Sequence, residues 1–369
     1  MSNEPLLPVP QDTMNSLGDL ITSMKVLVLT GPGGVGKTSS AAALAVGASL
    51  MGIRTCVVTI DPAKRLADAL GIEAIGNEPV KIDAFGSGDL YAVMLDADAT
   101  FDDLVVKYSK SEEQAARILA NTVYRNLTKN LSGIQEYMAM EKIFELHNDQ
   151  RFDLMVVDTP PSSNALDFLD APRRLIGFLD NKVFRLIMNP GPAFLRPVSF
   201  AARAVLKTIS KVVGSEVVDE AVAFFQDFEG MEEGFRSRAE SVQALMHDEA
   251  TAFIVVTAPR GDTVKEAASF GEKLAGFGFQ VAGLISNRHT PNFDGGTPSE
   301  ELSRRIAVSD RESLERNLNQ MEQLRISENR EIDWIAGLLA PRRLVKVPML
   351  AKDISNMEDL AKMARSLIK

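Results

Sequence analysis

A short glycine-rich segment between a buried strand and a helix constrains this chain more than any other feature. Residues 25–30 form a continuous apolar run, the pattern of a strand covered on both faces. Residues 39–51 are rich in alanine at helical spacing, which predicts a helix that ends near Gly52. A second apolar run follows at residues 55–60. Strand, loop, helix and strand in this order predict a right-handed βαβ unit.

The same rhythm recurs along most of the chain. Helical stretches separate further apolar runs, which predicts an α/β fold with a doubly wound, mainly parallel sheet of about seven to eight strands. Thr263 and Glu266 match a capping box that would open the helix after the run at 252–257. The remaining predicted strands are Tyr91–Leu95, Asp153–Val157, Ala252–Thr257, Gln280–Ser286 and Leu344–Val347.

Residues 168–248 interrupt this rhythm and predict an inserted helical subdomain, a possible site for binding a partner. Nine of the 18 phenylalanines fall there. Charge is also segregated, with eight basic and three acidic residues in 165–211 but two basic and ten acidic residues in 216–249. We expect a flexible leader at 1–23 and a nucleotide-binding domain built from 24–167 and 249–369. The phenylalanines could simply pack the helices together, or they could form an apolar groove.

The glycine-rich segment has the pattern G-x-x-x-x-G-K-[ST], which is that of a P-loop. Glycines allow backbone N–H groups to converge on phosphates, and the following helix directs its positive end at them. Lys37 supplies a cation for the β- and γ-phosphates and is expected to act in catalysis, while Thr38 offers a hydroxyl to Mg²⁺. The residues predicted to bind the nucleotide here are Gly31, Gly33, Gly34, Val35, Gly36, Lys37, Thr38 and Ser39.

Two acidic residues follow predicted strands. Asp158 ends the strand at 153–157 and would hold the Mg²⁺, or it could cap the next turn. Asp61 follows the strand at 55–60 and would orient or deprotonate a water beside the γ-phosphate. Alternatively, Asp61 only caps the helix predicted at 63–70. The two acids and the P-loop predict a Mg²⁺-dependent catalytic site.

The motifs GPGGVGKTS, TIDPAKRLADALG and VVDTPPSSNALDFLDAPRRL together resemble the family of arsenical pump-driving ATPases and eukaryotic tail-anchored-protein targeting ATPases. The resemblance runs from about residue 25 to the C-terminus. It implies a homodimer that hydrolyses ATP with Mg²⁺ and handles its client through the helical subdomain. It also implies that Asn287 reads the adenine edge, that Pro348 begins the loop flanking the base, and that ATP is preferred over GTP.

Two departures from the family pattern affect the dimer. Pro32 stands where family members usually have a lysine that reaches the partner subunit's nucleotide. The family's zinc-binding cysteine pair and metalloid-binding cysteine trio do not transfer, because Cys56 is the one cysteine. Cys56 lies in an apolar run and is expected to be a buried core residue. We therefore expect no zinc, and any dimer should be insensitive to chelators.

Composition limits the remaining classes of partner. The net charge is −10 and the isoelectric point is near 5.0, which disfavours nucleic acid as a partner. The chain has no apolar run of about 18 residues, and its first residues lack the basic start of a signal peptide. A cytoplasmic protein is expected. Peripheral contact with a membrane stays open, because the excess of basic residues in 165–211 would suit anionic lipids.

The sequence is compatible with three functions. The first is a Mg²⁺-dependent ATPase whose nucleotide cycle drives a conformational change in a helical subdomain that binds a protein client or a membrane-associated partner. The alternative is an ATP-dependent positioning or scaffold switch of the partition and septum-site type. A small-molecule kinase is a third reading, but the acids at Asp61 and Asp158 favour hydrolysis.

Overall fold

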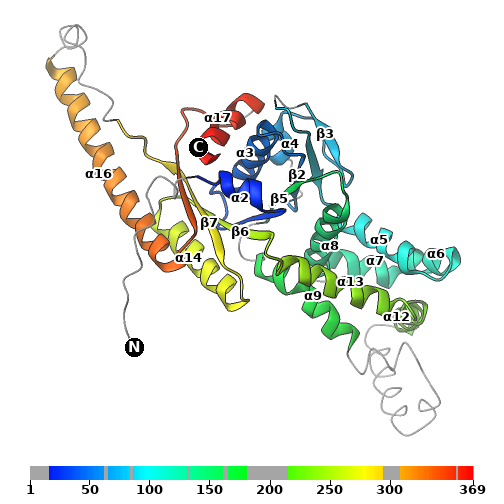
Figure 1. Ribbon diagram of the computed structural model, residues 1–369. Helices are drawn as coiled ribbons and strands as arrows, with labels where there is room; N and C mark the ends of the chain where they lie inside the picture. Colours follow the sequence, from blue (N-terminus) through cyan, green and yellow to red (C-terminus); the bar gives the residue numbers. More distant parts are fainter. Residues whose placement is uncertain are drawn as a thin grey trace.

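The computed structural model describes residues 16–61, 65–83, 86–130, 133–160, 165–180, 215–293, 308–354 and 356–368. Its centre is an eight-stranded sheet with the order β3-β4-β2-β5-β1-β6-β7-β8 (Figure 1). All described neighbours pair in parallel except β3 and β4, so the predicted doubly wound, mainly parallel sheet is confirmed. The strands are β1 (Val26–Thr30), β2 (Thr55–Thr59), β3 (Val80–Ile82), β4 (Leu90–Met94), β5 (Leu154–Asp158), β6 (Thr251–Thr257), β7 (Val281–His289) and β8 (Arg343–Pro348).

Helices cover both faces of the sheet, which explains why its central strands are apolar throughout. Leu27 and Leu29 of β1 point into one core, and Val26 and Val28 point into the other. The first core is closed by α2 (Gly18–Ser23), α3 (Lys37–Leu50), α4 (Arg65–Leu70) and α17 (Met357–Ile368). The second is closed by α8 (Ile134–Asn148), α9 (Ala165–Leu179), α13 (Glu232–Met246), α14 (Gly261–Gly276) and α16 (Val308–Leu339).

The leader predicted for residues 1–23 is wrong for its last residues. Residues 18–23 form the short helix α2, and Leu17, Leu20 and Ile21 are buried in the first core. The backbone N–H of Leu17 also donates to the carbonyl of Leu367 at 2.8 Å. These apolar side chains bury surface that would otherwise face water, which offsets the entropy lost on ordering the segment. Residues 1–15 lie outside the described part.

Within the described residues, seven helices form a helical lobe beside the sheet. The lobe contains the third core of the molecule. This core joins residues that precede β5 in the sequence to residues that follow it, since Phe101 packs against Phe235 with ring centroids 6.0 Å apart. Phe224, Phe228 and Phe235, three phenylalanines of the predicted insert, are buried in this core. The helices of the lobe are α5 (Ala97–Tyr108), α6 (Glu112–Ala120), α7 (Thr122–Asn130), α8, α9, α12 (Ser215–Asp227) and α13.

The described part of the lobe therefore uses those aromatic side chains for packing. The apolar positions between residues 183 and 213, where a client groove was also predicted, lie outside the described residues. Within the described ranges, no helix is both long enough and apolar enough to cross a bilayer.

Candidate active site

The tips of three adjacent strands bring the predicted phosphate residues together. β5 lies between β1 and β2 in the sheet, with Asp158 opposite Leu29 of β1 and Thr59 of β2. Because these strands are parallel, their carboxyl ends share one edge. In doubly wound sheets this edge is where ligands bind.

The P-loop after β1 needs glycine at two positions for different reasons. Gly31 has φ +143°, and a Cβ there would lie 2.1 Å from the carbonyl oxygen of Val256. Gly36 has φ +93°, and a Cβ there would lie 2.3 Å from the Asn287 side-chain nitrogen. At Gly31 a side chain would therefore collide with the backbone of β6, whereas at Gly36 the positive φ and the Asn287 amide both favour glycine.

The Lys37 side chain points back into the P-loop that precedes it in the chain. Its ammonium group donates to the carbonyl oxygens of Gly31 at 3.0 Å and Pro32 at 2.8 Å. The residue is 7% exposed, and burial lowers the pKa of Lys37 from its ordinary value. The P-loop thus curves around this cation, which is the arrangement needed to hold the β- and γ-phosphates.

Asp158 is buried at the tip of β5 and is tied to both neighbouring strands. Its Oδ2 accepts hydrogen bonds from Thr38 Oγ1 at 2.7 Å and Thr59 Oγ1 at 3.1 Å. Its Oδ1 is buried and has no hydrogen-bond partner among the described residues. Burial raises the pKa of Asp158 to about 6. A carboxylate with one unused oxygen beside a threonine hydroxyl is a donor set that fits Mg²⁺.

Asp61 lies just beyond β2 and is linked to Asp158 through Thr59. The Asp61 backbone N–H donates to Thr59 Oγ1 at 3.3 Å, and that hydroxyl donates to Asp158. Arg65 also contacts the Asp61 carboxylate, at 3.2 Å. Both predicted acids and Lys37 thus lie at one edge of the sheet. Residues 62–64 are outside the described part.

A cleft of about 450 Å³ adjoins the P-loop on the side of β7 and β8. The predicted residues Ser39, Asn287 and Pro348 line it, together with Gly36. Residues 349–354, which belong to the loop predicted to begin at Pro348, also line it. Arg260, Arg288 and Met363 line it too and were not predicted, because no motif marks them and they come from separate segments.

The Asn287 amide is engaged with the protein at both ends. Its Nδ2 donates to the carbonyl oxygen of Val35 at 2.9 Å, and its Oδ1 accepts from the backbone N–H of Arg288 at 2.9 Å. One Nδ2 hydrogen and one Oδ1 lone pair remain for other partners. Recognition of adenine by Asn287 therefore stays a prediction. Asn287 also has a second role, because its side chain supports the P-loop through Val35.

This fold and this edge of the sheet define a P-loop nucleotide-hydrolysing protein. The chain belongs to the anion-transporting ATPase family, whose pattern matches residues 24–369. This confirms the resemblance drawn from the motifs, and the chain is an ATPase. A protein called ATPase get3 from Schizosaccharomyces japonicus is 24% identical over 363 residues, covering 98% of each chain.

Two further relatives differ in how much of their length is matched. ATPase get3 from Neurospora crassa is 23% identical over 363 residues, covering 97% of this chain and 94% of the relative. A putative arsenical pump-driving ATPase from Chlorobaculum tepidum is 28% identical over 228 residues. That match covers 60% of this chain and 53% of the relative.

Proposed function

We propose that ATP binding and hydrolysis at this site drive a conformational change in the helical lobe, which binds a protein partner. One observation carries the proposal: the strand that ends in Asp158 leads into α9, which packs against α8 and α13 of the lobe. A shift of Asp158 on nucleotide binding would therefore be transmitted to the lobe through the chain itself.

In the proposed reaction, each predicted residue has one role. Lys37 binds the β- and γ-phosphate oxygens, and Asp61 orients the attacking water and accepts its proton. Thr38 and Asp158 would hold Mg²⁺, which supplies neutralisation of the phosphate charge when bound. The Asp158 carboxylate is positioned for this by the hydroxyls of Thr38 and Thr59.

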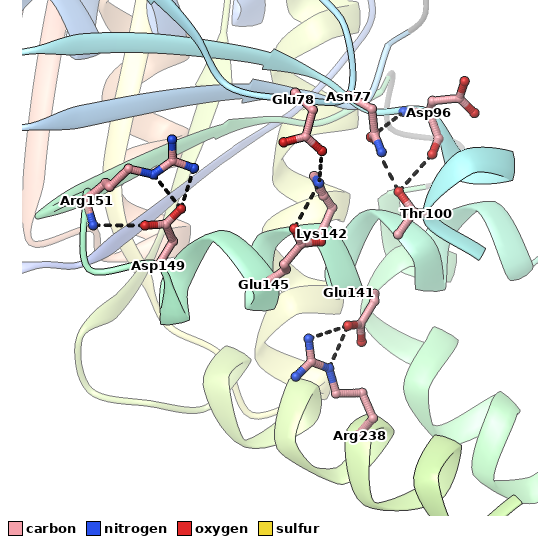
Figure 2. Close-up of polar contacts among 10 residues, drawn as sticks. All are labelled: Asn77, Glu78, Asp96, Thr100, Glu141, Lys142, Glu145, Asp149, Arg151 and Arg238. Carbon is pink, nitrogen blue, oxygen red and sulfur yellow. Dashed lines mark hydrogen bonds and ion pairs between the residues drawn. The ribbon is translucent and has the colours of Figure 1, made fainter. Parts of the chain in front are cut away.

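The segment between α4 and β3, which follows Asp61 in the chain, forms a second link between the site and the lobe. Figure 2 shows Glu78 of this segment reaching Lys142 of α8, at 3.5 Å. Only 1% of the Lys142 side chain is exposed, and its ammonium also contacts Glu145 at 3.1 Å. In the same segment, Asn77 accepts from the backbone N–H of Asp96, which caps α5. Movement of the segment would thus act on α5 and α8 together.

Inside the lobe, α8 is joined to α13 by a buried ion pair. Arg238 of α13 donates to Glu141 of α8 at 2.6 Å, and the Glu141 side chain is 2% exposed (Figure 2). Removing one member of such a pair leaves an uncompensated buried charge, so the two helices are expected to move as one unit. This supports a lobe that responds as a whole rather than one helix at a time.

The proposed partner is a protein with an apolar segment, bound by a homodimer of this chain. Cys56 is buried and is the one cysteine, so a cysteine trio for a metalloid cannot form within the chain. Pro32 cannot supply a charge to a partner subunit. We therefore expect the dimer to be held by other contacts and to be insensitive to chelators.

Hydrogen exchange with and without a non-hydrolysable ATP analogue tests the coupling. We expect changed protection in α8, α9 and α13, and a smaller change in the Lys142→Met variant. The matched control is Lys107→Met, because Lys107 is exposed on α5. Changes confined to the P-loop and the base cleft would show that the lobe is a passive addition.

A further inference from the structure

The carboxyl end of β7 supports the P-loop through an irregular backbone. The pairing of β7 with β8 shifts register between Ser286 and His289, and Arg288 has φ +63°. This left-handed conformation is costly for a residue other than glycine. It allows Asn287 to donate to the Val35 carbonyl at 2.9 Å and Arg288 Nη1 to donate to the Gly34 carbonyl at 3.2 Å.

Three buried side chains hold this irregular segment. Ser286 Oγ and His289 Nε2 lie 2.6 Å apart across the register shift. Glu328 reaches the segment from α16, where its Oε2 accepts from the Thr290 backbone N–H at 2.8 Å and its Oε1 accepts from Thr290 Oγ1 at 2.9 Å. Ser286, His289 and Glu328 are 0%, 5% and 7% exposed.

Ser286, His289 and Glu328 look like the residues of a hydrolytic triad, but they cannot act as one. Ser286 is fully buried, so no substrate reaches its hydroxyl. His289 Nδ1 is 3.7 Å from Glu328 Oε2, beyond hydrogen-bonding distance. Burial lowers the pKa of His289 to about 4, so the imidazole is neutral near pH 7. The cluster fixes backbone geometry instead of forming a nucleophile.

We propose that Glu328 and His289 are positioning residues for the ATPase reaction, acting through β7 on the P-loop and the base cleft. Neither contacts the cleft itself, since Asn287 and Arg288 form its wall. Loss of the Glu328 carboxylate would release Thr290 and let Arg288 relax toward ordinary backbone angles. The hydrogen bonds that Arg288 donates to Gly34 and Asn287 donates to Val35 would then be lost. This inference rests on the proposed ATPase function and on the prediction that the cleft beside Asn287 and Pro348 holds the adenine base.

Steady-state ATP and GTP hydrolysis by Glu328→Ala tests the inference. We expect the KM for ATP to rise by about fivefold to 20-fold and the preference for ATP over GTP to fall, with kcat changed less than about twofold. A merely structural role would lower the melting temperature without this division between KM and kcat. The conservative Glu328→Gln, which keeps one acceptor for Thr290, should restore most of the wild-type KM.

Two further variants keep the result decisive. Glu322→Ala changes the same charge on the same helix, where Glu322 pairs with Arg325, and should leave the KM unchanged. If Glu328→Ala fails to fold, Thr290→Val removes the hydroxyl donor with little change of shape and should raise the KM by about threefold. An unchanged KM and ATP preference in the folded variant would overturn the inference. Wild-type turnover in Lys37→Ala would instead overturn the site assignment.

Discussion

The phosphate side and the base side of the candidate site share one edge of the sheet but are assembled differently. The phosphate side takes Lys37 and Thr38 from one continuous segment after β1, Asp158 from the neighbouring strand β5, and Asp61 from just beyond β2, the next strand in the sheet. The base side collects Arg260, Asn287 and residues 348–354 from three distant segments. A contiguous motif can be found in a sequence. The lining of a cleft that comes from separate segments can be seen only when the fold brings those segments together.

The largest expected effect is on the phosphate side. Lys37→Ala removes the buried cation, so turnover should fall by about 100-fold to 1000-fold. Phosphate release by the purified variant measures it. The matched control is Lys25→Ala, because Lys25 lies at the opposite end of β1. Turnover that survives in Lys37→Ala would mean that the phosphate side is not where hydrolysis occurs.

Asp61→Asn should separate binding from chemistry within the phosphate side. The amide keeps the shape but is a poor proton acceptor, so kcat should fall by about 100-fold while ATP affinity stays within several-fold. Nucleotide titration and single-turnover hydrolysis give the two quantities. A collapse of affinity with unchanged turnover per bound ATP would make Asp61 a binding residue.

Asn287→Ala tests the base side directly. Loss of the amide removes the contact with Val35 and the predicted contact with adenine, so the KM for ATP should rise by about tenfold and the ATP preference should decrease. Asn148→Ala, an exposed change at the end of α8, is the control. Equal discrimination between ATP and GTP in wild type and variant would leave Asn287 with the P-loop support alone.

The smallest expected effect is a pH dependence of stability that belongs to the base side. The pKa of His289 is lowered by burial and by Lys346, against the opposing charge of Asp333, while Glu328 and Ser286 face its ring. Its stabilising contribution is therefore present above about pH 6.5 and is lost as the pH falls toward 4.

Denaturant unfolding at two pH values measures this contribution. Wild type should lose about 1 kcal/mol more unfolding free energy than His289→Asn between about pH 7 and about pH 5.5. Equal losses in both proteins would show that folding does not lower the pKa of His289. His289 would then give the base side no pH dependence of stability of its own.

Particular residues show how far the sequence could predict this molecule. Seven strands were predicted, because runs such as residues 25–30 are apolar on both faces. β3 was missed, since Val80 and Lys81 are exposed and the strand is three residues long. The capping box at Thr263 was wrong, because α14 begins at Gly261 and the Thr263 hydroxyl donates to the Ala258 carbonyl at 2.8 Å.

In the candidate site, too, some residues could be predicted from the sequence and others could not. Lys37, Thr38 and Asp158 were placed by local motifs, and the structure brings them together. Glu328 carries no signal of its own, since it is one acid among many on a long charged helix. Its role depends on the irregular end of β7, where backbone angles of Arg288 depart from those of a strand. A register shift of this kind leaves no mark in hydrophobic periodicity.

The burial of Cys56 has a practical consequence for watching this ATPase at work. Cys56 is fully buried in β2, and burial raises the pKa of its thiol to about 12. Thiolate is the form that reacts with alkylating reagents and oxidants, so the native chain should behave toward them as if it had no thiol. One cysteine introduced on α13 and another on α17 would therefore take fluorescent or spin labels without a background signal. The distance between the two labels could then be followed through a single turnover.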